Sequence, residues 1–183
     1  IDFEGRIVTQ DLGNSILEYQ SIKGGVESFK DIHTVLEIGA GYGRTSYVIL
    51  KLNPHLHYII VDIPPALYIS QRYLSQTFKG ERVFTFRDFN SFSSIEDEFY
   101  SSRVAFLMPH QLKLLPEKSA DLFLAIDCLH EMLPEQLKFY FSAIDRLSKN
   151  LYFKCWKETL IPFDGVPLGE KSYPILPHWK TIF

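Results

Sequence analysis

Three closely spaced glycines mark the part of the sequence whose residue types point most clearly to ligand binding. They stand in the run Glu37-Ile38-Gly39-Ala40-Gly41-Tyr42-Gly43, between a β-favouring segment and a stretch with helical periodicity. Glycine suits such a turn because it adopts positive φ freely and because a missing Cβ lets the backbone approach a ligand closely. The helix that follows also points its free N–H groups to the same place. The run predicts a ligand-binding loop, although a merely tight strand-to-helix turn would use the same residues.

A carboxylate, Asp62, ends the next apolar segment of the chain. In dinucleotide-binding folds an acid about 20 residues past the glycine loop binds ribose hydroxyls. A charge at the end of a buried strand is costly without a partner, and a ribose diol would be such a partner. The alternative role for Asp62 is to cap the helix that begins near Pro64.

The pattern Glu-x-Gly-x-Gly-x-Gly after one strand, with an acid after the next, resembles motif I and the following acidic position of class I S-adenosylmethionine-dependent methyltransferases. The resemblance covers roughly residues 33 to 156. It implies that Glu37 helps to hold the methionine end of the cofactor and that Asp62 binds the ribose. The other cofactor contacts that it implies lie in the loop, beside the adenine and after later strands: Gly39, Ala40, Gly41, Gly43, Ile63, His110, Gln111 and Asp127.

The sequence departs from two related patterns. The fingerprint GxGxxG of nicotinamide and flavin enzymes is not matched, because an acid precedes the glycines and Arg44 follows Gly43. After the third strand, many class I methyltransferases carry an acid for the adenine amino group, whereas this chain has Pro109-His110-Gln111. Either His110 or Gln111 can take that place, or backbone alone can hold the adenine. Short phrases such as 15–19 and Tyr173-Pro174 are similar to bacterial sugar O-methyltransferases.

The segment Asp127-Cys128-Leu129-His130-Glu131 follows the fourth buried strand and offers groups for proton transfer. A hydroxyl acceptor of a methyl group benefits from a base, and a neutral imidazole accepts a proton near pH 7. We therefore expect His130 to be the general base, with Glu131 as its orienting partner or as an alternative base. A histidine that only caps the next loop would look the same. The metalloprotease pattern HExxH is excluded, because Pro134 takes the place of its second histidine.

Alternating strand and helix patterns surround these residues. Segments 34–38, 58–62, 103–108, 121–126 and 151–156 are β-favouring and largely apolar, and 83–86 is weaker. Helical spacing follows the first two, and a helix is expected from Pro134 to about Lys149. This order predicts an α/β fold, a doubly wound Rossmann-like and mostly parallel sheet with helices on both faces, as in class I methyltransferases. The sixth and seventh strands usual in that fold are not visible in the sequence.

Three regions follow from this pattern. Residues 1–30 form a helical lead-in with a break at Gly24-Gly25, residues 31–156 form the S-adenosylmethionine-binding domain, and 157–183 form a tail rich in proline and aromatic residues. We expect the tail to be truncated, because the chain stops inside an aromatic segment. The tail aromatics Trp156, Tyr173, His178 and Trp179 can line an acceptor pocket or simply pack.

Composition narrows the function further. The net charge is −3 and the basic residues are scattered, which disfavours nucleic acid as a partner. Two distant cysteines without CxxC predict neither a disulfide nor a metal site. No apolar stretch is long enough to span a membrane, so a cytoplasmic protein is expected. The favoured acceptor is a small molecule or a saccharide, and the oligomeric state is left open.

The leading hypothesis is thus an S-adenosylmethionine-dependent methyltransferase acting on oxygen. A non-catalytic methyltransferase-like binding domain is the main alternative, because an intact glycine loop indicates cofactor binding but does not indicate catalysis. An NAD-dependent oxidoreductase is less favoured, since its fingerprint is missing. Methylation of nucleic acid is disfavoured by the charge and by the lack of an Asn/Asp-Pro-Pro-Tyr motif after the fourth strand.

Overall fold

The computed structural model describes residues 2–161 and 164–182. At its centre is a six-stranded sheet in the order β5-β6-β4-β3-β7-β8, and every pairing in it is parallel. The strands are β3 (Thr34–Ile38), β4 (His57–Val61), β5 (Val83–Phe84), β6 (Val104–Leu107), β7 (Ala120–Ile126) and β8 (Ser148–Lys154). Segment 83–86, whose β-strand pattern is weaker than that of the other five segments, contributes a strand of only two residues at one edge of the sheet.

The two central strands explain where the glycine loop and Asp62 meet. In β3 and β4 the last four residues of each strand are buried, which fits strands covered on both faces. Ile38 pairs with Val61, and the N–H of Gly39 donates to the carbonyl of Val61 over 3.0 Å. The loop after β3 and the residue after β4 thus leave the sheet side by side.

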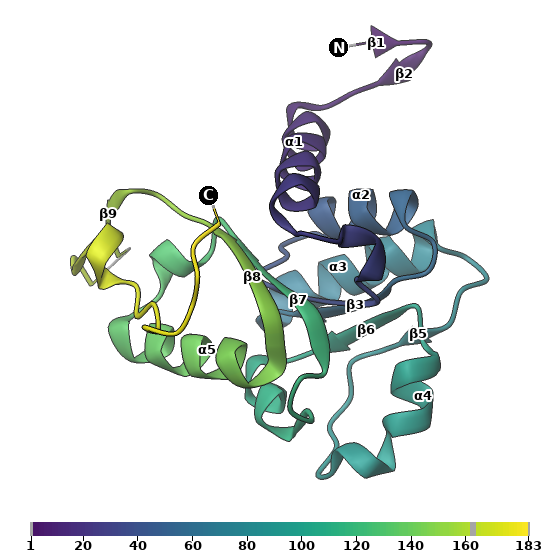
Figure 1. The fold of residues 1–183 in the computed structure, drawn as a ribbon. Helices are drawn as coiled ribbons and strands as arrows, with labels where there is room; N and C mark the ends of the chain where they lie inside the picture. The colour runs from purple at the N-terminus through teal and green to yellow at the C-terminus, as the bar shows by residue number, and fades with distance from the viewer. Residues whose placement is uncertain (1, 162–163, 183) are drawn as a thin grey trace.

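Helices cover both faces of the sheet, and each face has its own apolar core (Figure 1). On one side lie α2 (Arg44–Leu52) and α3 (Pro64–Thr77), whose Val48, Ile49 and Leu67 pack on the sheet. On the other lie α4 (Glu96–Ser101) and α5 (Pro134–Leu147), with Phe99 and Phe141 in the core. The predicted doubly wound α/β fold is confirmed.

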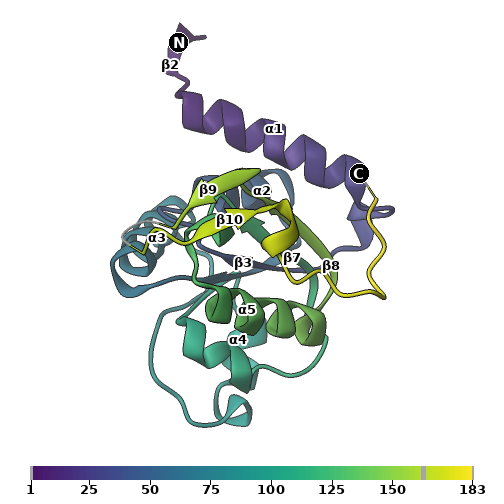
Figure 2. The same ribbon diagram turned by 90° about the vertical axis from the view of Figure 1, so that its left-hand side faces the viewer.

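The N-terminal region differs from the expected lead-in. Its first residues form a small antiparallel hairpin of β1 (Asp2–Phe3) and β2 (Arg6–Ile7). Helix α1 (Gln10–Gly25) then ends at Gly25, at the predicted break Gly24-Gly25, and a short 3-10 helix, Phe29–Asp31, follows it. Figure 2 shows α1 as a rod above the rest of the chain, with the hairpin at its far end. Tyr19 and Ile22 bury one side of α1 in the same core as α2, and the helix ends at the two glycines, whose helix propensity is low.

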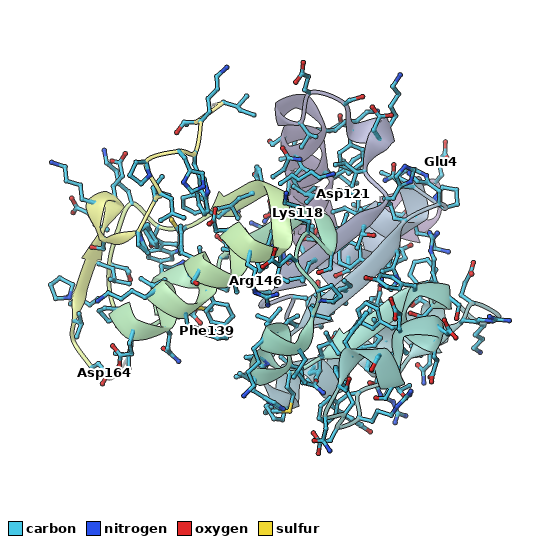
Figure 3. All side chains as sticks on the ribbon, turned by 60° about the horizontal axis from the view of Figure 1, so that its bottom comes forward. Glu4, Lys118, Asp121, Phe139, Arg146 and Asp164 are labelled. Atoms are coloured by element: carbon cyan, nitrogen blue, oxygen red, sulfur yellow. The ribbon has the colours of Figure 1, made fainter. Side chains whose placement is uncertain are left out.

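Helix α5 ends at Leu147, and β8 begins at the next residue, three residues earlier than expected. Contacts at its last turn explain the sharp change: the Arg146 guanidinium donates to the carbonyls of Leu112 and Leu115 over 2.7 and 2.6 Å. The N–H of Lys118 donates to the carbonyl of Arg146 (Figure 3). These bonds fix the end of α5 against the loop that precedes β7.

The tail is more ordered than its composition indicates. Strands β9 (Glu158–Leu160) and β10 (Pro167–Gly169) pair antiparallel in a separate small sheet. Beyond them the Trp179 ring stacks on Phe141 of α5, and its indole N–H donates to Asp145. Within the described ranges the main sheet ends at β8.

Candidate functional site

The glycine loop adopts the conformation for which its residues are suited. Gly39, Gly41 and Gly43 have φ angles of 66°, 58° and 89°, in a backbone region that residues other than glycine rarely adopt. At Gly39 there is also no room, because an added Cβ would lie 2.5 Å from the Cβ of Cys128. At Gly41 an added Cβ would meet nothing within 4 Å, so this glycine borders open space. Gly43 is the residue before α2 and its carbonyl accepts from the N–H of Tyr47.

Asp62 lies against this loop. One carboxylate oxygen, Oδ2, accepts from the N–H of Gly41 over 2.9 Å, and Oδ1 accepts from the N–H of Ile63 over 2.7 Å. Asp62 is 9% exposed, and burial raises the pKa of its carboxyl, while the two backbone hydrogen bonds oppose that rise. A carboxylate oxygen has lone pairs for a second donor, so both oxygens can still accept hydrogen bonds from a diol. The N-terminal cap of α3 is Ile63, without a side-chain capping bond.

Glu37 lies beneath the loop and is only 2% exposed. Its Oε2 accepts hydrogen bonds from the hydroxyls of Ser46 and Tyr58, over 2.6 and 2.8 Å. Burial is the main cause that raises the pKa of Glu37 to about 7, against the lowering effect of these two hydroxyls. The carboxyl therefore changes its protonation close to neutral pH.

Asp127 follows β7 with a φ of 54°, an uncommon value for a residue with a side chain. Its Oδ2 lies 3.0 Å from Nζ of Lys154 and 3.6 Å from a guanidinium nitrogen of Arg44. The sequence-based prediction included Asp127 but missed both cations. They come from the start of α2 and the end of β8, so the fold brings three chain segments together here.

A second carboxylate, Glu18 of α1, binds the same two cations. Arg44 donates to both its oxygens, over 2.7 and 3.1 Å, and Lys154 lies 3.0 Å from Oε1. Although burial alone would raise it, these partners hold the pKa of Glu18 below its ordinary value. Glu18 was not among the predicted site residues. The sequence did contain one indication that Glu18 is buried: it lies four residues before the buried Ile22, and so on the same face of the helix.

His130 sits in a short 3-10 helix, Leu129–Glu131, directly after β7. It is 7% exposed, and its Nδ1 is buried without a hydrogen-bond partner. Its ring centroid lies 5.6 Å from that of Trp156, an indole that is 63% exposed. The neighbouring Glu131 is exposed and leaves Nδ1 unpaired, so it does not orient the imidazole through this nitrogen as expected.

The remaining predicted contacts differ in their surroundings. Ile63 is 60% exposed beside Asp62, and His110 is exposed, so both side chains are accessible. Gln111 is fully buried: its amide oxygen accepts from the N–H of Met108 and its amide nitrogen donates to the carbonyl of Arg87. The expectation that Gln111 binds adenine is therefore not supported by its contacts, because its side chain joins two protein segments. Ala40 is buried, and its carbonyl accepts from the N–H of Gly43.

Two hollows in the surface lie away from this site. One, of about 430 Å³, is bordered by residues near the start of β4 and β6, such as His57 and Arg103. The other, of about 340 Å³, lies between the end of α1 and Ile182. The glycine loop borders open space and neither of these hollows, so the loop is a candidate binding site because of its hydrogen bonds and its backbone conformation. Among the described residues, no group of three or more His, Cys, Asp or Glu side chains is placed to hold a metal ion. In those same ranges no helix is long and apolar enough to cross a membrane.

Comparison with known proteins gives matches in structure alone. No family model and no curated protein sequence matches the chain. Among solved structures, it is similar to S-adenosylmethionine-bound CalS10, an amino pentose methyltransferase from Micromonospora echinaspora, with a TM-score of 0.52 and 12% identity. That match covers 81% of this chain and 52% of CalS10. It is also similar to the mitomycin 7-O-methyltransferase MmcR, with a TM-score of 0.51 and 17% identity over 81% of this chain and 39% of MmcR.

The chain thus spans about half the length of one of these proteins and less of the other. Their identities are low, so the likeness is one of fold. Together with the parallel sheet, the strand order and the glycine loop after β3, it shows that this chain has the class I methyltransferase fold.

Proposed function

We propose that this chain is the cofactor-binding part of an S-adenosylmethionine-dependent methyltransferase that acts on an oxygen atom of a small molecule or sugar. The observation that carries the proposal is the contact between Asp62 and Gly41, over 2.9 Å, at a glycine that borders open space. It combines a carboxylate that can accept from ribose hydroxyls with a backbone that a ligand can approach. We include in the proposal the cytoplasmic location expected from the sequence.

The residues around the loop fit the three parts of the cofactor. Asp62 would accept hydrogen bonds from the ribose, and the exposed Ile63 and His110 would border the adenine. Glu37 would support the loop at the methionine end from below, since its carboxylate is buried against Ser46 and Tyr58. Asp127 is the partly exposed carboxylate nearby that can accept from an ammonium group. The backbone of Gly39, Ala40, Gly41 and Gly43 would pass beneath the ligand.

When bound, S-adenosylmethionine would supply a methyl group on a sulfonium sulfur: a hydroxyl oxygen bonds to the methyl carbon in line with the breaking C–S bond, and the neutral thioether leaves. The chain's part in this reaction is to align the two reactants, to exclude water and to take up the hydroxyl proton. His130 is the proposed base for that proton. Its burial beside the exposed Trp156 places an imidazole next to an aromatic surface on which an acceptor can rest.

The proposed acceptor class draws on the two structural neighbours. One is described as an amino pentose methyltransferase and the other as a mitomycin 7-O-methyltransferase. Both names specify small acceptors, and the chain's net charge of −3 agrees with a partner that is not a polyanion.

The cofactor class can be tested by isothermal titration of the protein with S-adenosylhomocysteine, S-adenosylmethionine and NAD in separate runs. Binding of the first two, with no heat from NAD, supports the proposal. Binding of NAD alone would favour the oxidoreductase alternative. If the sulfur ligands bind but the whole protein transfers no methyl group to any phenol or sugar hydroxyl, the non-catalytic binding domain is favoured. If none of the three ligands binds, the proposal is wrong.

A further inference from the structure

Helix α1 docks on the glycine-loop side of the domain through polar side chains. Ser15 is fully buried and Glu18 is 5% exposed, whereas the apolar Leu17 is 67% exposed. Ser15 accepts from Arg44 over 2.8 Å, and Asp11 accepts from the hydroxyl of Tyr42, a residue of the glycine loop, over 3.1 Å. A carboxylate as buried as Glu18 is costly unless charged partners surround it. The first half of α1 is therefore held by these polar and charged contacts, together with the partly buried Leu12.

The partners of Glu18 are shared with the candidate site. Arg44 and Lys154 each lie within 4 Å of Glu18 and of Asp127, so two cations and two carboxylates alternate in space. Thr45 completes the shell of Glu18 by donating to Oε2 over 3.0 Å. Asp127 is 37% exposed and Glu18 is 5% exposed, which makes Asp127 the carboxylate of this network that a ligand can reach.

Removing the charge of Glu18 would change the field at Asp127. Both cations would then have Asp127 as their only carboxylate in this network, and its charge would be largely neutralised. The distances are short enough for this to matter, because all four ion pairs are well within the Debye length of about 8 Å at physiological ionic strength. Glu18 thus sets how much negative charge Asp127 presents to a ligand.

We infer that Glu18 is a positioning residue for the amino-acid end of the cofactor. Glu18 neutralises part of the positive charge of Arg44 and Lys154. Asp127 can then accept from the ligand's α-ammonium, while the two cations face the ligand's α-carboxylate. This inference rests on the proposed function, since it concerns the same cofactor. It makes α1, which lies outside the α/β sheet, a part of the binding site.

Titrations with two ligands can distinguish an effect of Glu18 on the amino-acid end of the cofactor from an effect on cofactor binding as a whole. S-Adenosylhomocysteine carries the α-ammonium and α-carboxylate, whereas 5′-methylthioadenosine keeps the adenine, ribose and sulfur but lacks both charges. In calorimetric titrations, Glu18→Gln should weaken binding of S-adenosylhomocysteine about tenfold, which corresponds to about 1.4 kcal/mol. Binding of 5′-methylthioadenosine should stay within about twofold of the wild-type value, because the adenosine part does not touch this network.

Matched variants keep the experiment interpretable. Glu27→Gln removes an exposed carboxylate just beyond α1 and should change neither affinity. Lys154→Met, at a side chain that is 45% exposed, leaves the pair of Glu18 and Arg44 in place. It removes one of the two cations that face the α-carboxylate, so it should lower only the S-adenosylhomocysteine affinity. This second variant also serves if Glu18→Gln fails to fold, which circular dichroism would show.

These titrations distinguish a failure of the inference about Glu18 from a failure of the proposed methyltransferase function. Equal losses for both ligands would mean that α1 only supports the loop, and would overturn the inference, as would unchanged binding of S-adenosylhomocysteine in both network variants. Neither result would affect the proposed function, because wild-type binding of both ligands would still support it. If the wild type binds neither ligand, the proposed function itself fails and the inference fails with it.

Discussion

The carboxylate of Asp62 accepts a hydrogen bond from the backbone N–H of Gly41, a residue 21 positions earlier in the chain. The contact joins the end of β4 to the loop after β3 at the edge where the two strands finish together. In an open parallel sheet this edge is where ligands bind. The local geometry and the fold therefore indicate the same place.

The glycines of the loop should differ in their tolerance of alanine. Gly39→Ala meets both an unfavourable φ and a contact of 2.5 Å with Cys128, and we expect it to lower the free energy of unfolding by about 3 kcal/mol or more. Gly41→Ala meets only the unfavourable φ, in open space, and should cost about 1 kcal/mol. Urea unfolding of both variants measures the difference. Equal costs would contradict the crowding seen at Gly39.

The buried carboxyl of Glu37 should make stability depend on pH. With a folded-state pKa of about 7 and an ordinary value of 4.5, folded Glu37 keeps a proton that the unfolded chain has lost between these values. The free energy of unfolding should therefore fall as pH rises through this window, by about 3 kcal/mol in all. Glu37→Gln, which titrates nowhere in this range, should lack this part of the decline. Chemical unfolding at pH 4.5, 6 and 7.5 measures it, and parallel curves for the two proteins would count against a raised pKa.

The ring contact between His130 and Trp156 should be visible in fluorescence. The chain has two tryptophans, so Trp179→Phe leaves Trp156 as the only indole, 5.6 Å from His130. At a fixed pH, adding His130→Gln to this variant should change the emission intensity and wavelength of Trp156, because the indole loses the ring packed beside it. If the emission spectrum is the same with and without His130→Gln, the ring contact is not formed in solution.

His130 should also separate binding from catalysis. His130→Gln should leave the affinity for S-adenosylhomocysteine within about twofold, because Gln fills a similar place and His130 is not among the proposed cofactor contacts. Methyl transfer by the whole protein to a hydroxyl acceptor should fall by about 10² to 10⁴, the range for loss of a general base. Single-turnover transfer measures this, and full activity in His130→Gln would assign the base to another group.

Short-range patterns let the sequence predict the centre of the site. The glycine loop, Asp62 and the strands around them are local signals, since each depends on residues within one strand–turn–helix unit. The N-terminal hairpin was missed because strands of two residues are too short to show any periodicity. The end of α1 at Gly24-Gly25 was predictable, because glycine has a low helix propensity and the signal is local.

The charge network around Asp127 lies beyond such local reasoning. Glu18 and Lys154 are 136 residues apart, and many pairs of opposite charge in the sequence would have been equally plausible partners. Gln111 was one of two candidates for the adenine contact because of its place after β6, but its amide oxygen accepts from the N–H of Met108 and its amide nitrogen donates to the carbonyl of Arg87, 24 residues away. Long-range partners decide both cases, and only the fold shows them.

The measurement that tests the account most directly is calorimetric titration of S-adenosylhomocysteine into wild-type protein and Asp62→Asn, with Asp88→Asn as a control at an exposed carboxylate. Removing the charge of Asp62 should weaken binding by about tenfold to a hundredfold, the cost of losing a charge-assisted hydrogen bond of about 1.5–3 kcal/mol. The control should bind as the wild type does. Equal affinity in wild type and Asp62→Asn, with both folded, would contradict the assignment of Asp62 as the ribose-binding residue.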